Sequence, residues 1–377
     1  MTKLAIDLTY QPMGGALAQI NEIIKNIDSY DFDNVVFYLS NDNLHFFDDT
    51  NDTKIILHPV PFSNKSIIFR TIWAQLILPV SLIVNHVDVL FCPGNISPLL
   101  NLRKKVQWIG TVGPFEKNFI PLFGLKTKII LILTKYLIIF SSLTSDIVIF
   151  ESNYTRELFV RKYKQKIEKS AVLHIGNDDY FQPVDTNYSE TAKKYSEREY
   201  ILTVSHLYPY KNIEILIDSY YHSQLHKREL YVLIAGSTTD KSYFDKLNSQ
   251  VRKYGLEDYI IFLGRVGKQD LRELYSQCKI FVFTSPFENF AYTLVEAMSC
   301  SAPIIATNTT AMPETCGDAA LYYSSDSEQE LQNCMLTFLE NENIRKQYKE
   351  RSLNKSSEYE IYSVINQKTN QILEKLV

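Results

Sequence analysis

The sequence contains few cysteines, and no two of them lie close together in the chain. Five occur in 377 residues, at Cys92, Cys278, Cys300, Cys316 and Cys334, and none belongs to a CxxC pair. A scattered, odd set argues against a disulfide framework and against a cysteine-ligated zinc site. We therefore expect reduced thiols, as in a cytoplasmic protein.

The chain also lacks an excess of basic residues. Asp and Glu outnumber Lys and Arg by 43 to 39, which gives a net charge of −4. Nucleic-acid-binding domains usually carry a basic excess, so that class is disfavoured. No GxGxxG follows any expected strand, which disfavours a dehydrogenase of the Rossmann type.

Long uninterrupted apolar runs are scarce as well. The most apolar segment, Ile129 to Phe140, has twelve residues and contains Lys135. A bilayer-spanning helix needs about 20 apolar residues, so we interpret this segment as a buried or interfacial helix. The first residues, MTKLAIDLTY, lack the apolar core of a signal peptide, and we expect none.

Short apolar runs instead alternate with longer amphipathic ones, such as Ala16 to Ile27 and Ile67 to Val84. Apolar residues make up 45% of the chain and charged residues 22%, as in soluble globular proteins. The expected strands are KLAIDL, NVVFYL, KIILHPV, DVLFCP, KVQWIGTV, DIVIFES and SAVLHI in the first half, then EYILTVSH, ELYVLIAGS, YIIFLGRV, KIFVFTS and APIIATN. This rhythm predicts an α/β protein with two doubly wound, Rossmann-like domains facing a cleft.

A polar stretch after Pro183 separates the two sets of strands. We place a first domain at residues 1–184 and a second at residues 185–358. Residues 359–377 carry an apolar stripe and are expected to form a helix that packs back towards the first domain.

The stretch SPFENFAYTLVEAMSCSAPIIATN holds two glutamates, Glu288 and Glu296, just after an expected strand. Ligands of open α/β sheets bind beyond the carboxyl ends of strands, and a helix N-terminus favours phosphate. Carboxylates suit vicinal hydroxyls, so the stretch predicts a site for a sugar, a diphosphate and a ribose. The spacing alone fits equally well a surface glutamate followed by an ion-paired helical one.

This stretch resembles the signature of retaining glycosyltransferases of family 4, which have the GT-B fold. The matching pattern is Glu-x7-Glu, then Ala-Met, small residues, Pro303 and a strand. The segment SHLYPYKN resembles the family's phosphate-binding segment, with Lys211 in the lysine position. Further likeness, in QPMGGALAQI, DVLFCPGNISPL, IFESNYTRELFV and MPETCGDAALYY, extends it over nearly the whole chain.

The resemblance implies roles for individual residues. Glu296 would bind the ribose hydroxyls, Glu288 the donor sugar, and Lys211 the leaving diphosphate. The catalytic set would be Glu288, Lys211 and His206. The remaining donor-binding residues would be Phe290, Ala291, Tyr292, Thr293 and Leu294 at the helix start, Gly14 and Gly15 beside the pyrophosphate, and Arg265 and Val266 near the base.

The sequence departs from the family pattern at two places that bear on catalysis. His206 stands where many relatives have an arginine, so either a protonated His206 or another cation, such as Arg265, would complete the charge. The loop QWIGTVGPFEKNF lacks the family's histidine. Gly113 lies near that position, and Glu116 and Lys117 are the polar candidates on the acceptor side.

We expect no metal and no cofactor besides the nucleotide-sugar substrate. The triplet Asp31-Phe32-Asp33 is interpreted as turn residues rather than a metal motif. Residues 103–128 carry six basic residues and one acidic residue, interleaved with aromatic and apolar ones. This mixture suits an anionic membrane surface and suggests a lipid-linked acceptor, although a solvated surface fits it too.

The predicted protein is thus a cytoplasmic, metal-independent retaining glycosyltransferase at the inner face of the plasma membrane. It would move a hexose-type sugar from a nucleotide-sugar to a lipid-linked saccharide during synthesis of a surface polysaccharide, an O-antigen or capsule. Two alternatives stay open. One is a catalytically silent partner or scaffold with the same fold, supported by His206 and the absent loop histidine. The other is a nucleotide-sugar epimerase, which would need acid and base groups around the sugar.

Overall fold

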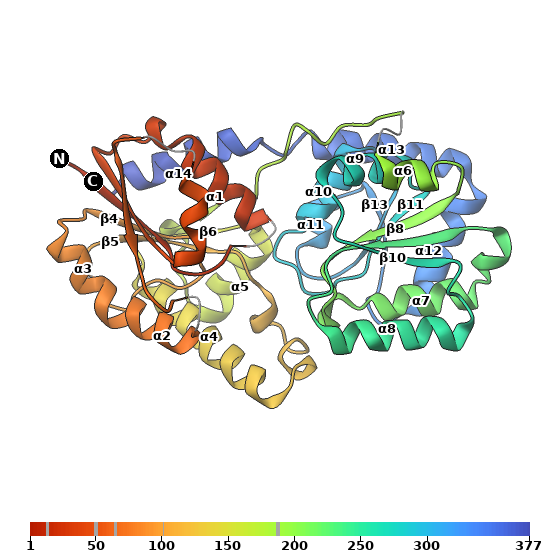
Figure 1. Cartoon of the computed structure of the whole chain (residues 1–377), viewed down its shortest axis with the longest axis horizontal. Helices are drawn as coiled ribbons and strands as arrows, with labels where there is room; N and C mark the ends of the chain where they lie inside the picture. The colour runs from red at the N-terminus through yellow and green to blue at the C-terminus, as the bar shows by residue number, and fades with distance from the viewer. Residues whose placement is uncertain (13–14, 49–51, 64–65, 101, 186–188) are drawn as a thin grey trace. The chain divides into compact units, whose positions relative to one another are not determined.

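The computed structural model describes the chain except residues 13–14, 49–51, 64–65, 101 and 186–188. It contains two compact units: unit 1 comprises residues 1–176 and 360–377, and unit 2 comprises residues 177–359. Each unit is a parallel sheet with helices on both faces (Figure 1). The predicted α/β class with two Rossmann-like domains is confirmed.

The sheet of unit 1 has seven parallel strands in the order β3-β2-β1-β4-β5-β6-β7. Its central strands are almost wholly buried, because helices cover both faces, and this explains their unbroken apolar sequences. The strands are β1 (Lys3–Leu8), β2 (Asn34–Leu39), β3 (Ile55–Pro59), β4 (Val89–Cys92), β5 (Lys104–Ile109), β6 (Ile147–Phe150) and β7 (Ser170–Val172).

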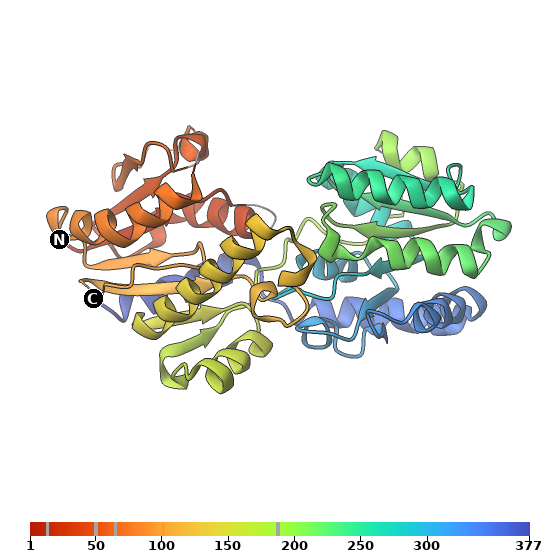
Figure 2. The same ribbon diagram turned by 90° about the horizontal axis from the view of Figure 1, so that it is seen from below.

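Helices divide between the two faces of this sheet. Helices α1 and α14 cover one face, and α2, α3, α4 and α5 cover the other (Figures 1 and 2). The helices are α1 (Gly15–Lys25), α2 (Ile67–Ile72), α3 (Leu78–Val84), α4 (Leu125–Thr144), α5 (Asn153–Tyr163) and α14 (Tyr362–Glu374). Short helical turns are η1 (Ile27–Ser29), η2 (Asn41–Phe47), η3 (Trp73–Ile77), η4 (Gly113–Phe115), η5 (Ile120–Leu122) and η6 (Ile167–Lys169). Asp31 to Asp33 lie in the turn before β2, and the Asp33 carboxylate accepts from the Thr2 N–H.

Two helical stretches of unit 1 are long and apolar, yet most of their residues are not buried. Residues 67–84 form one stretch, in which the π-helical turn η3 precedes Pro79, whose nitrogen has no hydrogen to donate. Helix α4 has 20 residues and contains the apolar segment Ile129 to Phe140, which the sequence analysis interpreted as helical. Both stretches are long and apolar enough to cross a membrane by length and composition, and only 22% of each apolar window is buried.

The two units divide between residues 176 and 177 rather than between 184 and 185. Asn177 Nδ2 donates to Ser299 Oγ at 3.0 Å, and the Val184 N–H donates to Ser276 Oγ at 3.2 Å. These bonds attach residues 177–184 to helices of unit 2. The second division falls between 359 and 360, which assigns α14 to unit 1.

The sheet of unit 2 has six parallel strands in the order β10-β9-β8-β11-β12-β13. Strands β8, β9 and β10 therefore follow one another towards one edge of the sheet. The chain then crosses to β11 on the other side of β8, and β12 and β13 follow towards the opposite edge. The strands are β8 (Tyr200–Val204), β9 (Tyr231–Ala235), β10 (Ile260–Gly264), β11 (Ile280–Phe283), β12 (Ile304–Thr307) and β13 (Ala320–Tyr323). Strands β8 and β11 thus form a switch point, where ligands of such sheets bind.

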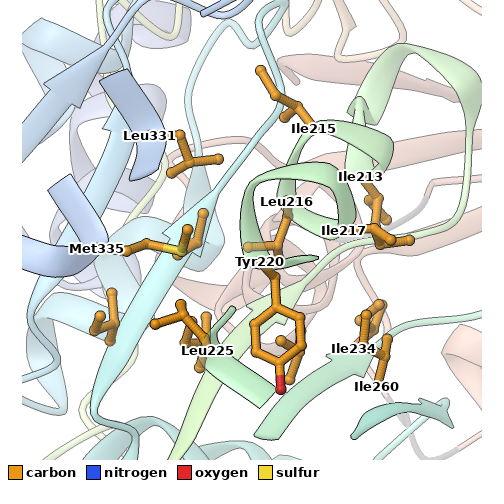
Figure 3. Close-up of a cluster of buried hydrophobic side chains, with 14 of the residues drawn as sticks. Ile213, Ile215, Leu216, Ile217, Tyr220, Leu225, Ile234, Ile260, Leu331 and Met335 are labelled. Atoms are coloured by element: carbon orange, nitrogen blue, oxygen red, sulfur yellow. The ribbon is translucent and has the colours of Figure 1, made fainter. Parts of the chain in front are cut away.

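The core of unit 2 lies between the sheet and its helices. Apolar side chains of α7, such as Leu216 and Tyr220, lie close to Ile234 of β9 and Met335 of α12 (Figure 3). The helices are α6 (Glu190–Tyr195), α7 (Ile213–His222), α8 (Lys241–Tyr254), α9 (Lys268–Gln277), α10 (Tyr292–Ser299), α11 (Met312–Cys316), α12 (Glu328–Glu340) and α13 (Glu342–Ser356), with turns η7 (Pro209–Lys211) and η8 (Leu225–Arg228). This packing fixes the strand ends that carry the candidate site.

Replacing Gly236, just after β9, with alanine is expected to destabilise unit 2. A Cβ atom there would lie 1.8 Å from the carbonyl oxygen of Ser205, and the φ angle is +146°. Because the clash is with backbone, no rotamer relieves it, and the free energy of unfolding should fall by roughly 3 kcal/mol or more. Urea denaturation measures this change. The control is Gly255→Ala, where φ is +64° and the space is open; it should cost only about 1 kcal/mol, and equal losses would contradict the argument.

Candidate functional site

The candidate site lies at the carboxyl ends of β8 and β11 in unit 2. Strand β8 is followed by a loop and by turn η7, which ends at Lys211. Strand β11 is followed by the loop that holds Glu288 and leads into α10. The switch point of the sheet therefore brings together two residues that are 77 positions apart in sequence.

Lys211 and Glu288 form an ion pair. Lys211 Nζ lies 2.5 Å from Glu288 Oε1, and the two side chains are only 14% and 18% exposed. Ser285 Oγ donates to the same carboxylate oxygen at 2.7 Å, and Thr284 Oγ1 donates to the Lys211 carbonyl at 2.6 Å. Burial alone would lower the pKa of Lys211, but the interactions with Glu288 and Tyr210 outweigh it and raise that pKa. Lys211 is therefore cationic at neutral pH.

The surroundings of His206 disfavour its protonated form. Burial, together with the nearby charges of Lys211 and Arg265, lowers the pKa of His206. Its Nδ1 atom is buried and has no hydrogen-bond partner among the described residues. Of the two sources of charge left open by the sequence, the structure therefore favours Arg265, an exposed residue directly after β10, over a protonated His206.

Helix α10 begins beside Glu288. Ala291 is its N-cap residue and has no side-chain oxygen with which to cap the first N–H groups. Phe290 is buried against the Tyr359 ring, with the ring centroids 5.4 Å apart. The predicted phosphate-binding segment Phe290, Ala291, Tyr292, Thr293 and Leu294 is therefore the start of this helix, where the helix dipole favours an anion.

Glu296 lies further along α10 in a different environment from Glu288. It is 7% exposed and accepts a hydrogen bond from Tyr275 Oη at 3.0 Å. Burial raises the pKa of Glu296 to about 8; Tyr275 and Lys268 oppose this rise, and Asp178 adds to it. At neutral pH this carboxyl is therefore largely protonated, in contrast to the ion-paired Glu288.

The predicted acceptor-side residues and the predicted glycine pair belong to unit 1. Gly14 lies outside the described residues, and Gly15 is the first residue of α1. Gly113 is buried in η4, where its Cα lies against the Phe119 ring. Glu116 accepts a hydrogen bond from Tyr154 Oη at 2.8 Å, and Lys117 is exposed. Val266, for its part, follows Arg265 in unit 2 and is half-buried.

Some polar groups at the strand ends were not predicted. Tyr275 and Ser285 contact the two glutamates, and no local pattern marks them. In unit 1, the buried Asp7 lies one residue before the end of β1 and accepts from the Thr9 hydroxyl at 2.7 Å. Glu151 directly follows β6 and accepts from Trp108 Nε1 at 3.0 Å. A carboxylate directly after an apolar run, as in KLAID and DIVIFE, is the signal that could have identified the last two.

No cluster of three or more His, Cys, Asp or Glu residues that could hold a metal ion occurs in the part of the chain that the structure describes. All five cysteines are free thiols. The site itself contains carboxylates, cations and the start of a helix, groups suited to hydroxyls and phosphates.

The fold and this site define a class. Two parallel-sheet, Rossmann-like domains are the GT-B architecture of glycosyltransferases, and solved structures share it over the whole chain. HepE of Anabaena, solved in complex with UDP, aligns with 100% of both chains at a TM-score of 0.73 and 18% identity. The predicted GT-B fold is confirmed.

Residues 184–355 match the family model described as "Glycosyl transferases group 1". The O-antigen chain mannosyltransferase B of Escherichia coli is 28% identical over 182 residues, 47% of this chain and 47% of the relative. The serotype-specific mannosyltransferase WbdA of Escherichia coli is 30% identical over 162 residues, 43% of this chain and 20% of the relative. The chain thus spans about half, or less, of the curated relatives that it matches.

The stability of the protein is expected to fall with rising pH through Glu296. The pKa of this carboxyl is raised from 4.5 to about 8 by folding. Between these values the unfolded chain has released the proton while the folded chain still holds it. Stability from this group is therefore fully present below about pH 4.5, and it declines by about 1.4 kcal/mol per pH unit up to about pH 8.

Urea denaturation across this pH range checks the effect. Glu296→Gln should remove this part of the slope, because the amide does not titrate. The control is Glu350→Gln, a change of an exposed glutamate on α13. An unchanged slope in Glu296→Gln would contradict the assignment.

Proposed function

We propose that the protein is a retaining, metal-independent glycosyltransferase that takes a hexose-type sugar from a nucleotide-sugar. The observation that carries this proposal is the Lys211–Glu288 ion pair at the switch point of a domain of the group 1 family. The start of α10 lies beside that pair and offers N–H groups to a phosphate. A cation, a carboxylate and a helix N-terminus together suit a sugar joined to a diphosphate.

In the proposed reaction the bond from the sugar anomeric carbon to the diphosphate breaks, and a bond to the acceptor oxygen forms on the same face. The acceptor's proton passes to the leaving phosphate oxygen, so no separate protein base is required. Lys211 stabilises the negative charge that grows on the diphosphate, and Glu288 binds sugar hydroxyls through its second oxygen. One well-placed group of this kind contributes about 100- to 1,000-fold in rate.

The ion pair has no net charge, so a further cation is needed beside the diphosphate. The lowered pKa of His206 disfavours that residue in this role. We assign the role to Arg265, an exposed residue directly after β10 whose charge acts on His206 and whose guanidinium suits a phosphate. Glu296 would bind the ribose hydroxyls, as the family resemblance implies, and Tyr275 would hold its carboxyl in place.

The relatives suggest the sugar and the process. Both Escherichia coli relatives are named as mannosyltransferases, and one as an O-antigen chain mannosyltransferase. Mannose is therefore the first candidate sugar, and surface polysaccharide synthesis is the first candidate process. HepE was solved with UDP, so the base of the nucleotide has more than one candidate. We propose a lipid-linked saccharide as the acceptor, presented at the cytoplasmic face of the membrane.

A nucleotide-sugar should stabilise the protein against heat without added metal. A ligand at about 100 times its dissociation constant adds roughly 2.7 kcal/mol to the free energy of unfolding, a shift of several degrees. The measurement is thermal unfolding with GDP-mannose, UDP-glucose and dTDP-glucose, each with EDTA. Lys211→Met should abolish the shift, and Lys346→Met, which changes an exposed lysine on α13, should preserve it. No shift with any donor at millimolar concentration would favour the silent scaffold.

Arg265→Gln should lower kcat/KM for the donor by about 10- to 100-fold, because a charge-assisted hydrogen bond to phosphate is lost. His206→Gln should change the rate less than Arg265→Gln, because burial and the nearby cations lower the pKa of His206 and disfavour its charged form. Initial rates of sugar transfer, or of donor hydrolysis, measure both effects. A rate loss confined to His206→Gln that is relieved at low pH would assign the charge to His206 instead.

A further inference from the structure

Unit 1 exposes a large set of apolar side chains that its core does not use. We call this set the apolar face; it consists of the exposed apolar residues of 67–84, of Leu99, Leu100 and Leu102, and of 125–144. Leu76 and Leu133, one on each helical stretch, are 64% and 59% exposed. Among the described residues of unit 2, by contrast, Leu353 is the one large apolar residue that is exposed. An apolar surface of this extent marks an interaction site.

The parts of the apolar face are joined to one another. Gln75 Nε2 donates to the Ser97 carbonyl at 3.3 Å, and the Leu99 N–H donates to Gln75 Oε1 at 2.8 Å. Ser97 Oγ in turn lies 3.1 Å from Ser145 Oγ, directly after α4. The two helical stretches also pack on the same side of the sheet, and Figure 2 views that side.

The charge of this region has the opposite sign to that of the whole chain. Residues 66–145 contain eight basic and two acidic residues, a net charge of +6, although the chain carries −4. Neither helical stretch contains an acidic residue, while Lys126, Lys128 and Lys135 lie on α4. Apolar side chains bordered by lysine match the acyl region and the phosphates of an anionic lipid surface.

We propose that the apolar face is a docking surface for an anionic lipid bilayer, on which unit 1 lies without crossing it. This inference rests on the proposed function, because it gives a lipid-linked acceptor its direction of approach. Lys135 Nζ lies 6.0 Å from the centre of the Phe115 ring in η4. The acceptor-side loop with Glu116 and Lys117 therefore follows directly from a turn that contacts α4.

The side of α4 that packs against the core of unit 1 argues against a transmembrane span. Ile138 and Ile139 belong to the core of unit 1. Gln107 Nε2 donates to Ser141 Oγ at 2.9 Å, and Lys105 Nζ donates to Thr144 Oγ1 at 2.9 Å. Drawing α4 into a bilayer would remove these partners from two buried polar residues of β5. A second copy of the chain is disfavoured as the occupant, because residues 66–145 carry +6 in each copy and two such regions repel each other.

The test is co-sedimentation of the full chain with vesicles. Vesicles of equal parts phosphatidylglycerol and phosphatidylcholine should bind the protein at low salt. Vesicles of phosphatidylcholine alone should bind it at least about ten-fold more weakly, and high salt should release it. Leu76→Glu combined with Leu133→Glu should reduce binding by at least about ten-fold. Lys126→Gln combined with Lys128→Gln should reduce it by roughly 30-fold, about five-fold for each charge.

The matched control is Leu353→Glu, which changes an exposed leucine of unit 2 and should bind as the wild type does. Donor-induced thermal shifts in every variant report that unit 2 is intact. Vesicle binding without any donor shift would uphold the docking surface while the proposed function fails. Three outcomes would overturn the inference. The Leu76/Leu133 variant could bind vesicles as well as the wild type does. Detergent but not high salt could release the protein from the vesicles, or the protein could form a stable dimer that the same substitutions dissociate.

Discussion

The ion pair between Lys211 and Glu288 is the interaction on which the candidate site depends. The pair forms because β11 lies next to β8 in the sheet of unit 2, although β9 and β10 separate the two strands in sequence. The carboxyl ends of β8 and β11 are therefore neighbours. Neither charge would be stable alone at this depth, since burying an unpaired ion costs several kcal/mol. Each partner therefore offsets the cost of burying the other, and the sheet topology brings them together.

Two glutamates of one loop-and-helix segment end in opposite electrostatic states. Glu288 lies beside a cation and accepts from Ser285, whereas Glu296 is buried behind Tyr275 with its pKa raised to about 8. Environments that separate two carboxyl groups in this way let them take different roles in one site.

The strands and helices could largely be predicted from the sequence, whereas most of the contacts between them could not. Apolar alternation was enough to predict twelve of the thirteen strands, but not β13 (ALYY), whose pairing with β12 is a tertiary contact. Helix α4 extends beyond the apolar segment that identified it, because Lys126 and Lys128 interrupt the apolar run without interrupting the helix. The contact of Lys211 with Glu288 and the lowered pKa of His206 depend on residues brought together only by folding. The roles of Glu288, Glu296 and the acceptor-side residues stay predictions.

The net charge of the chain is distributed unevenly along the sequence, which its overall composition does not reveal. Residues 66–145 carry +6, so the remaining residues carry −10. An anionic surface attracts the first set and repels the second, which orients the molecule before any apolar contact forms. Because the field weakens over a Debye length, about 8 Å at physiological salt, the lysines near the apolar face contribute most of this attraction. Charge then selects the face that approaches the bilayer, and the leucine and isoleucine side chains of α2, α3 and α4 hold it there.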